Sequence, residues 1–219
     1  MYKVSGLMNI SRYIFFIAVL SSALMAKGYP QPKTFSHASK IYKQIDFDYT
    51  RTAFTNEFYV YDPTTCMDKN YVKGDPSRSV VFARIVSEER MLQARKCGRE
   101  KTCTNHLGKP YGGSLCCRKT DPVYKAFDSD ILNIIPITKE SLKKLKEPPF
   151  HFKGNIARVY LYINAQYGLN LSYEEQMKYL SWHVLDKVDE KECKIYKQVY
   201  KIQKHKNPWI ESGCEALLK

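Results

Sequence analysis

Asp121 to Pro136 read D-P-V-Y-K-A-F-D-S-D-I-L-N-I-I-P, and the organisation of the chain is clearest from this segment. It opens with Asp-Pro, a favoured turn start. Val123, Tyr124, Phe127 and Ile131 then recur at helical spacing, and an apolar I-I-P follows. The pattern predicts an amphipathic helical segment that closes on an apolar run.

Three short polar side chains lie within this segment: Asp128, Asp130 and Asn133. An amide oxygen beside an apolar run is a neutral ligand for a hard cation, so Asn133 is the candidate metal ligand. The alternative is that the three side chains cap the helix and face water.

Composition and charge describe a folded, basic protein. The chain has 219 residues, of which 44% are apolar, and 35 Lys and Arg against 22 Asp and Glu give a net charge of +13. This length is one domain plus extras and is sufficient to bury a core. The charge indicates a polyanionic partner: nucleic acid, an acidic glycan or an anionic membrane surface.

The N-terminus has the pattern of an export signal. Lys3 and Arg12 form a positive region, Tyr13 to Leu24 is an apolar run, and Ala26 offers a small residue for cleavage. The apolar run is too short to span a bilayer, which takes about 20 residues; an uncleaved anchor is the alternative. Removing residues 1–26 takes away two basic and no acidic side chains, so the net charge falls from +13 to +11.

Seven cysteines fit an exported chain, where disulfides persist: Cys66, Cys97, Cys103, Cys116, Cys117, Cys193 and Cys214. They contain no C-x-x-C pair, so the spacing does not indicate a zinc site. Adjacent Cys116 and Cys117 are not expected to bond to each other, because the linking peptide would be strained. The odd number leaves at least one thiol free or intermolecular.

Before the central segment, the patterns predict strands and loops. Residues 27–40 form a polar, Pro-containing lead-in, expected to be mobile near its start. Phe54 to Tyr61 alternates loosely and is a candidate strand, and Ser79 to Val86 is the strongest strand candidate. A polar stretch, Ser87 to Arg95, and a Cys- and Gly-rich loop, Lys96 to Thr120, follow.

After the central segment, three helices are expected. The first is Gly154 to Tyr167, with Gly168 as its stop. The second begins at Ser172, which forms a capping box with Glu175, and runs to about Leu185. The third begins near Asp189 and runs to about His205.

Lysines gather in two runs. One is Lys139, Lys143, Lys144, Lys146 and Lys153; the other is Lys187, Lys191, Lys194, Lys197, Lys201, Lys204 and Lys206. A single run indicates a solvated face. Two runs on a strongly basic chain favour contacts with phosphates, which set affinity without choosing a sequence.

An ordered series of short motifs identifies a family. It comprises D-P-V-Y (121–124), S-D-x-x-N-x-x-P (129–136), E-P-P (147–149), G-x-I-A-R-x-Y-L-Y (154–162), Q-Y-x-L-x-L-S (166–172), K-I-Q (201–203) and N-P-W-I (207–210), with Trp182, Glu192-Cys193 and Cys214. The series resembles the bacterial periplasmic and secreted endonuclease I family, non-specific nucleases of the His-Me finger class. The resemblance covers residues 121–214 well and 79–117 more weakly.

The resemblance implies a fold and a chemistry. The fold is a single domain over residues 27–219, mixed α+β and mostly helical, around a ββα-metal core stapled by disulfides. The chemistry is hydrolysis of DNA and RNA phosphodiesters with Mg²⁺, or Mn²⁺ or Ca²⁺ in its place. A glutamate and an asparagine hold the ion, which stabilises developing charge, and a histidine after the glutamate acts as general base.

Only some of the family's site residues have a match in this sequence. Asn133 matches the metal-binding asparagine. Glu88, slightly preferred, or Glu89 can supply the metal carboxylate, and the remaining glutamate is a candidate catalytic base. The family histidine is absent, because Glu89 or Arg90 stands in its place, depending on the register. His106 is the candidate for its rescue, whereas His37, His151, His183 and His205 read as structural or solvent-facing.

The better-kept positions lie in the scaffold. Arg158, Lys201, Gln203 and Asn207 match family motifs and are candidates either to contact phosphate or to brace the active-site wall. Arg158 is equally suited to a buried ion pair. The resemblance also implies a Cys193–Cys214 disulfide that ties the last predicted helix to the C-terminus.

Three functions compete on these grounds. The first is an exported, metal-dependent, non-specific endonuclease with reduced or lost activity. The second is a pseudo-nuclease that binds nucleic acid or a protein without cutting, and the third is a secreted protein acting on a host or competitor molecule. The loss of the histidine favours weak or absent catalysis. The mature chain is expected to be a monomer with no membrane span.

Overall fold

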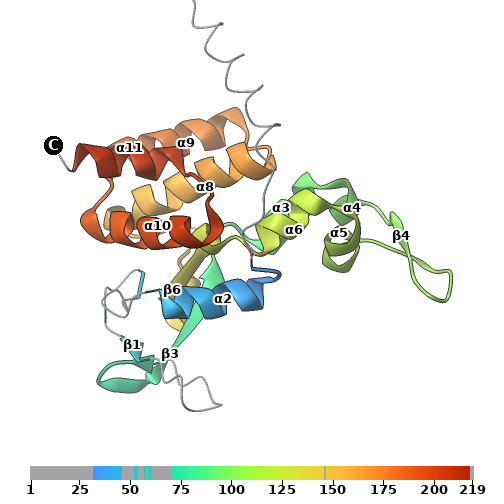
Figure 1. Cartoon of the computed structure of the whole chain (residues 1–219), viewed down its shortest axis with the longest axis horizontal. Helices are drawn as coiled ribbons and strands as arrows, with labels where there is room; N and C mark the ends of the chain where they lie inside the picture. The colour runs from blue at the N-terminus through green and yellow to red at the C-terminus, as the bar shows by residue number, and fades with distance from the viewer. Residues whose placement is uncertain are drawn as a thin grey trace, which may run out of the picture. The chain divides into compact units, whose positions relative to one another are not determined.

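The computed structural model describes residues 32–45, 52, 53, 57, 59, 60, 71–145 and 147–217, and Figure 1 shows their arrangement. The mixed, mostly helical α+β class predicted from the sequence is confirmed, and so is stapling by disulfides. The expected signal peptide, its boundary at residue 26 and Cys66 lie outside the described residues.

The larger of the two sheets in the described part of the chain has four strands. Its order is β1 (Tyr59–Val60), β2 (Tyr71–Val72), β3 (Asp75–Arg84) and β6 (Ile134–Thr138). β3 and β6 are antiparallel, with Val80 opposite Thr138 and Arg84 opposite Ile134. β3 thus contains most of the strand expected at 79–86, whereas β6 is formed by the apolar run that closes the central segment.

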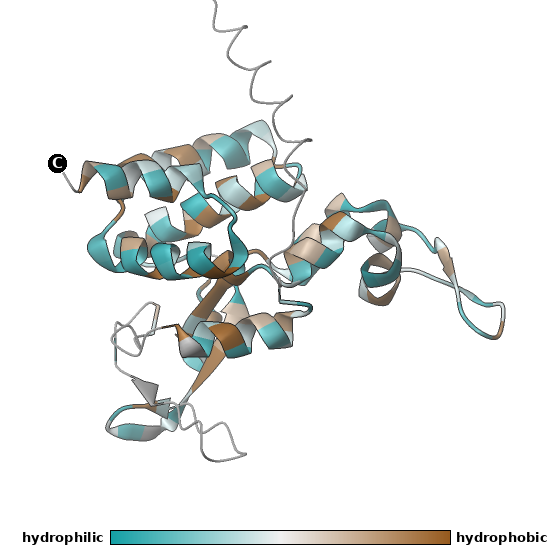
Figure 2. Ribbon diagram, viewed as in Figure 1, coloured by the Kyte–Doolittle hydropathy of each residue, from teal (hydrophilic) through white to brown (hydrophobic). Residues whose placement is uncertain are grey.

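All five residues of β6 are buried, which explains why its sequence is a continuous apolar run and not an alternation. Pro136 fits because its carbonyl accepts a hydrogen bond from the Ala53 N–H at 2.8 Å. Within a strand the N and O of one residue point to the same side, so the N–H that proline lacks is not one that would bond to β3. In Figure 2, β3 and β6 carry the brown of hydrophobic residues.

The lead-in expected at residues 27–40 is wrong over its described part. Helix α2 (Phe35–Gln44) begins after Thr34, whose hydroxyl accepts a hydrogen bond from the His37 N–H at 3.2 Å. It packs against β6 and buries Ala38 completely. Phe35, Ala38, Ile41 and Tyr42 recur at helical spacing, so the sequence contains the pattern of this helix, although it was not recognised.

The central segment forms three short elements. Asp121 caps α6 (Pro122–Asp128), accepting hydrogen bonds from the Val123 and Tyr124 N–H groups at 3.0 Å. A 3₁₀ turn, η2 (Ile131–Asn133), leads directly into β6. The alternative in which Asp128, Asp130 and Asn133 face water is wrong, because each of these side chains is no more than 2% exposed.

The predicted polar stretch and Cys-rich loop contain regular structure. They form α3 (Glu88–Ala94), α4 (Lys96–Arg99), the hairpin β4 (Cys103–Thr104) and β5 (Pro110–Tyr111), and α5 (Ser114–Thr120). Two disulfides, Cys97–Cys117 and Cys103–Cys116, hold these elements together. The adjacent cysteines therefore bond to separate partners, as expected.

After β6, the chain passes through α7 (Lys139–Leu142) and a 3₁₀ turn, η3 (Phe150–Phe152), into the C-terminal helices. These are α8 (Lys153–Tyr167), α9 (Tyr173–Leu185), α10 (Glu190–Gln203) and α11 (Pro208–Ala216). The predicted stop at Gly168, with φ of 64°, and the Ser172–Glu175 capping box are confirmed. α11 was not predicted. The implied Cys193–Cys214 disulfide joins it to α10.

α7 packs against β3 and β6, so these three elements have the order of a ββα unit. The helix is only four residues long, however. A ββα-metal core in the family's sense stays a prediction.

Candidate functional site

Asn133 joins the end of β3 to the beginning of β6. Its side-chain Oδ1 accepts a hydrogen bond from the Val86 N–H at 2.7 Å, and its Nδ2 donates to the Val86 carbonyl at 3.0 Å. The backbone carbonyl of Asn133 also accepts from the Ile85 N–H at 3.0 Å. The side chain is buried, and both of its polar atoms are engaged within the protein.

This contact brings the two predicted halves of the site together. Val86 precedes Ser87, whose hydroxyl caps α3 by accepting a hydrogen bond from the Arg90 N–H at 3.2 Å. Glu88 and Glu89 form the first turn of that helix. The segment expected to hold the metal carboxylate therefore starts directly after Val86, the residue whose backbone is hydrogen-bonded to the Asn133 side chain.

Glu88 points into a cluster of charged and polar groups. Its Oε1 accepts a hydrogen bond from the Tyr124 hydroxyl at 2.6 Å and one from Arg118 Nη2 at 3.3 Å. Burial, and then the bond to Glu88, raise the pKa of Tyr124, so the phenol stays protonated and remains a donor.

Asp128 completes the cluster with two arginines. Arg118 donates from Nε to Asp128 Oδ2 at 3.0 Å and from Nη2 to Oδ1 at 3.2 Å, and Arg84 Nη2 donates to the same Oδ1 at 2.6 Å. The Asp128 side chain is only 2% exposed, whereas that of Arg118 is 38% exposed. Hydrogen bonding to Asp128 raises the pKa of Arg118, so its charge is permanent.

Glu89 has different surroundings. Its side chain is exposed, and hydrogen bonds from its own backbone amide and then from Ser87 lower its pKa. The first turn of a helix favours the ionised form in the same direction. A carboxylate with a lowered pKa is a weak proton acceptor at neutral pH, so Glu89 is a poor substitute for an imidazole base.

Arg90, the other residue aligned with the family histidine, has a structural role. It forms an ion pair with Glu175 at 3.0 Å and donates to the carbonyls of Leu169 and Asn170, both at 3.4 Å. These bonds fasten α3 to the loop before α9. Arg90 cannot accept a proton.

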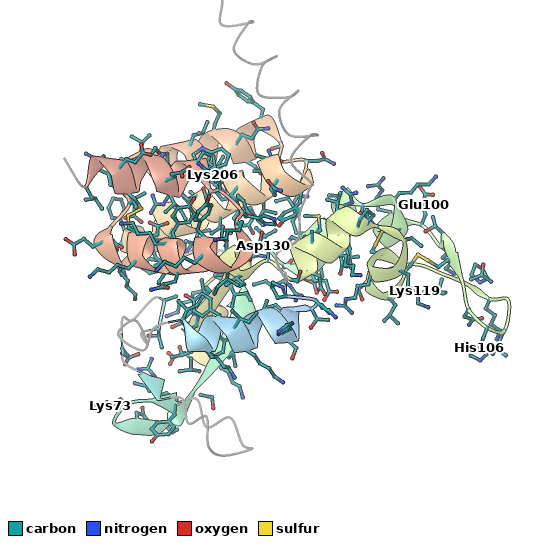
Figure 3. All side chains as sticks on the ribbon, viewed as in Figure 1. Lys73, Glu100, His106, Lys119, Asp130 and Lys206 are labelled. Carbon is teal, nitrogen blue, oxygen red and sulfur yellow. A yellow bond between two sulfur atoms is a disulfide. The ribbon has the colours of Figure 1, made fainter. Side chains whose placement is uncertain are left out.

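The histidines are spread over the described part of the chain. His106, the candidate for rescue, is exposed in the loop between β4 and β5, where Figure 3 labels it. His183 lies 3.5 Å from Arg158, and burial and then the arginine charge lower its pKa. His205 Nδ1 lies 3.9 Å from Asp130.

Asp130 is the centre of a buried network that the sequence did not reveal. Its Oδ2 accepts hydrogen bonds from the Tyr162 and Tyr167 hydroxyls at 2.6 and 2.5 Å, and its Oδ1 accepts from Gln203 Nε2 at 2.7 Å. Gln203 Oε1 in turn accepts from the Ile131 N–H at 3.0 Å. The network ties η2 to α8 and to the end of α10.

The four candidate nucleic-acid residues have unlike positions. Gln203 and Asn207 are buried, and Asn207 caps α11 and donates to the Arg158 carbonyl at 3.3 Å. Arg158 is fully buried and pairs with Glu192 through two bonds of 2.7 and 2.6 Å. It therefore occupies the buried ion pair that was one of its two predicted roles. Lys201 is exposed, and its contact with phosphate stays a prediction.

Lys201 belongs to a basic face. Lys194, Lys197 and Lys201 are exposed and follow one another along α10 at intervals of three or four residues, and the exposed Lys204 caps the end of the helix. Residues at such intervals lie on one side of a helix. We call this set the α10 lysine face.

The charged cluster does not fit a divalent metal ion. The Glu88 carboxylate holds Arg118, the Asn133 amide holds the Val86 peptide, and both oxygens of Asp128 bind arginine. Within the described ranges, no group of three or more His, Cys, Asp or Glu side chains is placed to hold a metal. Divalent-metal dependence is what the family suggests; the donors here are already used by cations of the protein.

A cavity of about 850 Å³ lies between β6, α8 and α10, with Ile134, Ile135, Val159, Ile195 and Val199 among its lining residues. Glu88, Arg118 and Asp128 are not among the described residues that line it. Its walls are mainly apolar and include the acidic residues Asp189, Glu190 and Glu192, which do not suit a phosphate, so the cavity is not the candidate site.

The chain is similar to known nucleases. The Endonuclease I family model matches residues 136–214. The chain is 34% identical to an extracellular deoxyribonuclease of Aeromonas hydrophila over 64% of this chain and 71% of that protein. Endonuclease-1 of Buchnera aphidicola is 27% identical (strain APS; 60% of this chain, 62% of that protein) and 23% identical (strain Bp; 94% and 95%).

The protein belongs to the class of exported, disulfide-stapled α+β proteins, which are periplasmic or secreted. Its three disulfides support this, because disulfides persist in oxidising compartments, and so does its similarity to an extracellular relative. In the part of the chain that the structure describes, no helix has both the length and the apolar character needed to cross a membrane. Within that class, the chain belongs to the endonuclease I family, a family of secreted nucleases.

Arg84, Arg118 and Tyr124 were missed as site residues. Arg84 ends β3 directly after the apolar residues 80–83, and Arg118 directly follows the two cysteines of α5. A charged residue in such a position is a weak signal, because its partners lie far away in the sequence.

Proposed function

We propose that the protein binds nucleic acid through backbone phosphates, and that its hydrolysis of DNA and RNA is severely reduced or lost. One observation carries the proposal. The carboxylate that would serve a metal, Glu88, is bonded to Arg118 and Tyr124, and the residue after the glutamate pair is an arginine fixed to Glu175.

Loss of the base alone would weaken the reaction. A positioned general base contributes roughly 10²–10⁴-fold to such a step. Glu89 has a lowered pKa and Arg90 cannot accept a proton, so neither supplies an equivalent. Loss of metal binding would remove the stabilisation of developing charge in addition.

Nucleic acid as the ligand is supported by charge and by family. The chain carries a net charge of +13, and the α10 lysine face presents four exposed ammonium groups. The relatives are named for action on DNA or as endonucleases. Phosphate contacts of this kind give salt-dependent binding without sequence choice.

The test is cleavage and retention of plasmid DNA and of RNA by the oxidised mature chain. Each substrate is incubated with Mg²⁺, with Mn²⁺ and with EDTA, beside a Glu88→Gln variant. We expect retention in a gel at low salt and no metal-dependent cutting. Asn133→Ala is a poorer control, because Asn133 supports the fold.

Metal-dependent nicking that Glu88→Gln abolishes would show that the site still works as a nuclease, and the proposal would be overturned. Absence of both cutting and retention would also overturn the proposal, because the protein would then not bind nucleic acid. It would be a secreted protein that acts on another kind of molecule. Comparing the two substrates also measures any preference between DNA and RNA.

A further inference from the structure

Arg118 lies where the predicted metal carboxylate would bind its ion. Its guanidinium bridges Glu88 and Asp128, with Nη2 at 3.3 Å from Glu88 Oε1 and at 3.2 Å from Asp128 Oδ1, and Nε at 3.0 Å from Asp128 Oδ2. A planar cation that spans two carboxylates performs the electrostatic task that a metal ion performs between two acidic ligands.

The charges of the cluster are already balanced. Two carboxylates, Glu88 and Asp128, face two guanidinium groups, Arg118 and Arg84. A divalent ion entering between them would meet two fixed positive charges at close range, and it would have to displace hydrogen bonds from both acids. The surroundings therefore oppose metal binding even though carboxylates are present.

Arg118 is held firmly but is not hidden. Its side chain is 38% exposed, and within the described residues it donates hydrogen bonds from Nε and Nη2. Nη1 therefore remains to donate to an incoming acceptor. Phosphate oxygens are the acceptors for which a guanidinium is best suited.

We propose that Arg118 is a built-in replacement for the divalent cation, so that this site binds a backbone phosphate of nucleic acid without metal. The phosphate ligand rests on the proposed function. The exclusion of metal does not, since it follows from the ion pairs alone.

Metal exclusion is tested without nucleic acid. Free Mn²⁺ is measured by electron paramagnetic resonance during titration of wild type, Arg118→Gln, Arg118→Lys and Arg99→Gln. Arg99 is an exposed arginine of α4 and serves as the matched control for loss of one charge. We expect Mn²⁺ binding to appear only in Arg118→Gln, because only that change frees Glu88 from its cation and leaves Asp128 with Arg84 alone. Binding by the wild type, or none by a folded Arg118→Gln, would overturn the inference.

The phosphate contact is tested with short duplex DNA in EDTA and in Mn²⁺. We expect wild-type affinity to be the same in both. Arg118→Gln should bind about tenfold more weakly in EDTA, as expected for one charge-assisted contact, and should recover in Mn²⁺. Metal-dependent binding by the wild type would overturn the inference even if the variant failed to fold. Complete absence of DNA binding, with Mn²⁺ binding gained by Arg118→Gln, would overturn the proposed function and leave the cation replacement standing.

Discussion

At the scale of single residues, Asn133 extends the pairing of β3 with β6. The regular ladder ends at Arg84 and Ile134, and the Ile85 N–H still bonds to the Asn133 carbonyl. Beyond that point the Asn133 amide donates to and accepts from Val86, as a strand residue would. A position that resembles a metal ligand thus serves here as a structural clamp.

Asn133→Ala should lower the free energy of unfolding by about 1–3 kcal/mol, because it leaves the buried N–H and C=O of Val86 without partners. Urea unfolding followed by circular dichroism measures the change. Gln93→Ala removes an exposed amide of α3 and should stay within about 0.5 kcal/mol of wild type. Equal stability of the two variants would contradict the clamp.

The sequence predicted part of this site. The motif series related Asn133 to the segment containing Glu88 and Glu89, and the absence of the histidine was visible directly. The role of Arg118 could not be predicted, because its partners lie 10 and 30 residues away and meet it only after α5 and α6 have packed. The hydrogen-bond network around Asp130 could not be predicted for the same reason.

At the scale of elements, the helix caps were predicted from the sequence, whereas helices α2 and α11 were not. Gly168, the Ser172–Glu175 box and Asp189 act on neighbours within four residues, so the sequence contains the whole signal. α2 and α11 depend on tertiary contacts: α2 packs on β6, and α11 is bonded through Cys214 to α10. Asn207 and Pro208, just beyond the end predicted at about His205, are the cap and first residue of the next helix.

The buried contact between Arg158 of α8 and Glu192 of α10 should make the free energy of unfolding depend on pH. Burial raises the pKa of Glu192 to about 7, although Arg158 opposes the rise, and its ordinary value is 4.5. The folded state therefore holds this proton more tightly than the unfolded chain does. The stability contributed is fully present below pH 4.5 and is lost as the pH rises to about 7.

Glu192→Gln should remove this dependence. The wild type should lose about 3 kcal/mol of unfolding free energy across that window, whereas the variant, which keeps the shape of the protonated acid, should lose much less. Urea unfolding at several pH values from about 5 to about 8 measures both. Glu190→Gln, an exposed carboxylate of the same helix, should follow the wild type. Parallel curves for wild type and Glu192→Gln would contradict the prediction.

At the scale of the whole molecule, charge was the most reliable prediction from sequence. The two lysine runs were visible without a structure, and Lys194, Lys197 and Lys201 of the second run prove to be exposed on one side of α10. Family membership was also predictable, because it rests on an ordered series of motifs spread over half of the chain. The preservation of those motifs in the scaffold explains why the fold was predicted better than the site.

The α10 lysine face should set the salt dependence of binding. The double variant Lys197→Gln/Lys201→Gln should reduce the slope of log affinity against log salt by about 2, since each lost phosphate contact removes roughly 0.9. Fluorescence anisotropy with labelled duplex DNA at several salt concentrations gives the slope. Lys101→Gln/Lys109→Gln removes the same charge from two exposed lysines outside both lysine runs and should change it less. Equal slopes for the two double variants would mean that net charge alone governs binding.

Two of the disulfides end on neighbouring residues of α5, Cys116 and Cys117, which bond to Cys103 and Cys97. An isomer with these partners exchanged has the same mass and the same number of bonds. Trypsin does not separate the two cysteines, because it cleaves after Lys or Arg and neither lies between them. Fragmentation of that single peptide bond in a mass spectrometer distinguishes the isomers. Arg118 is the next residue, so a preparation with the native number of disulfides can still carry a misplaced guanidinium.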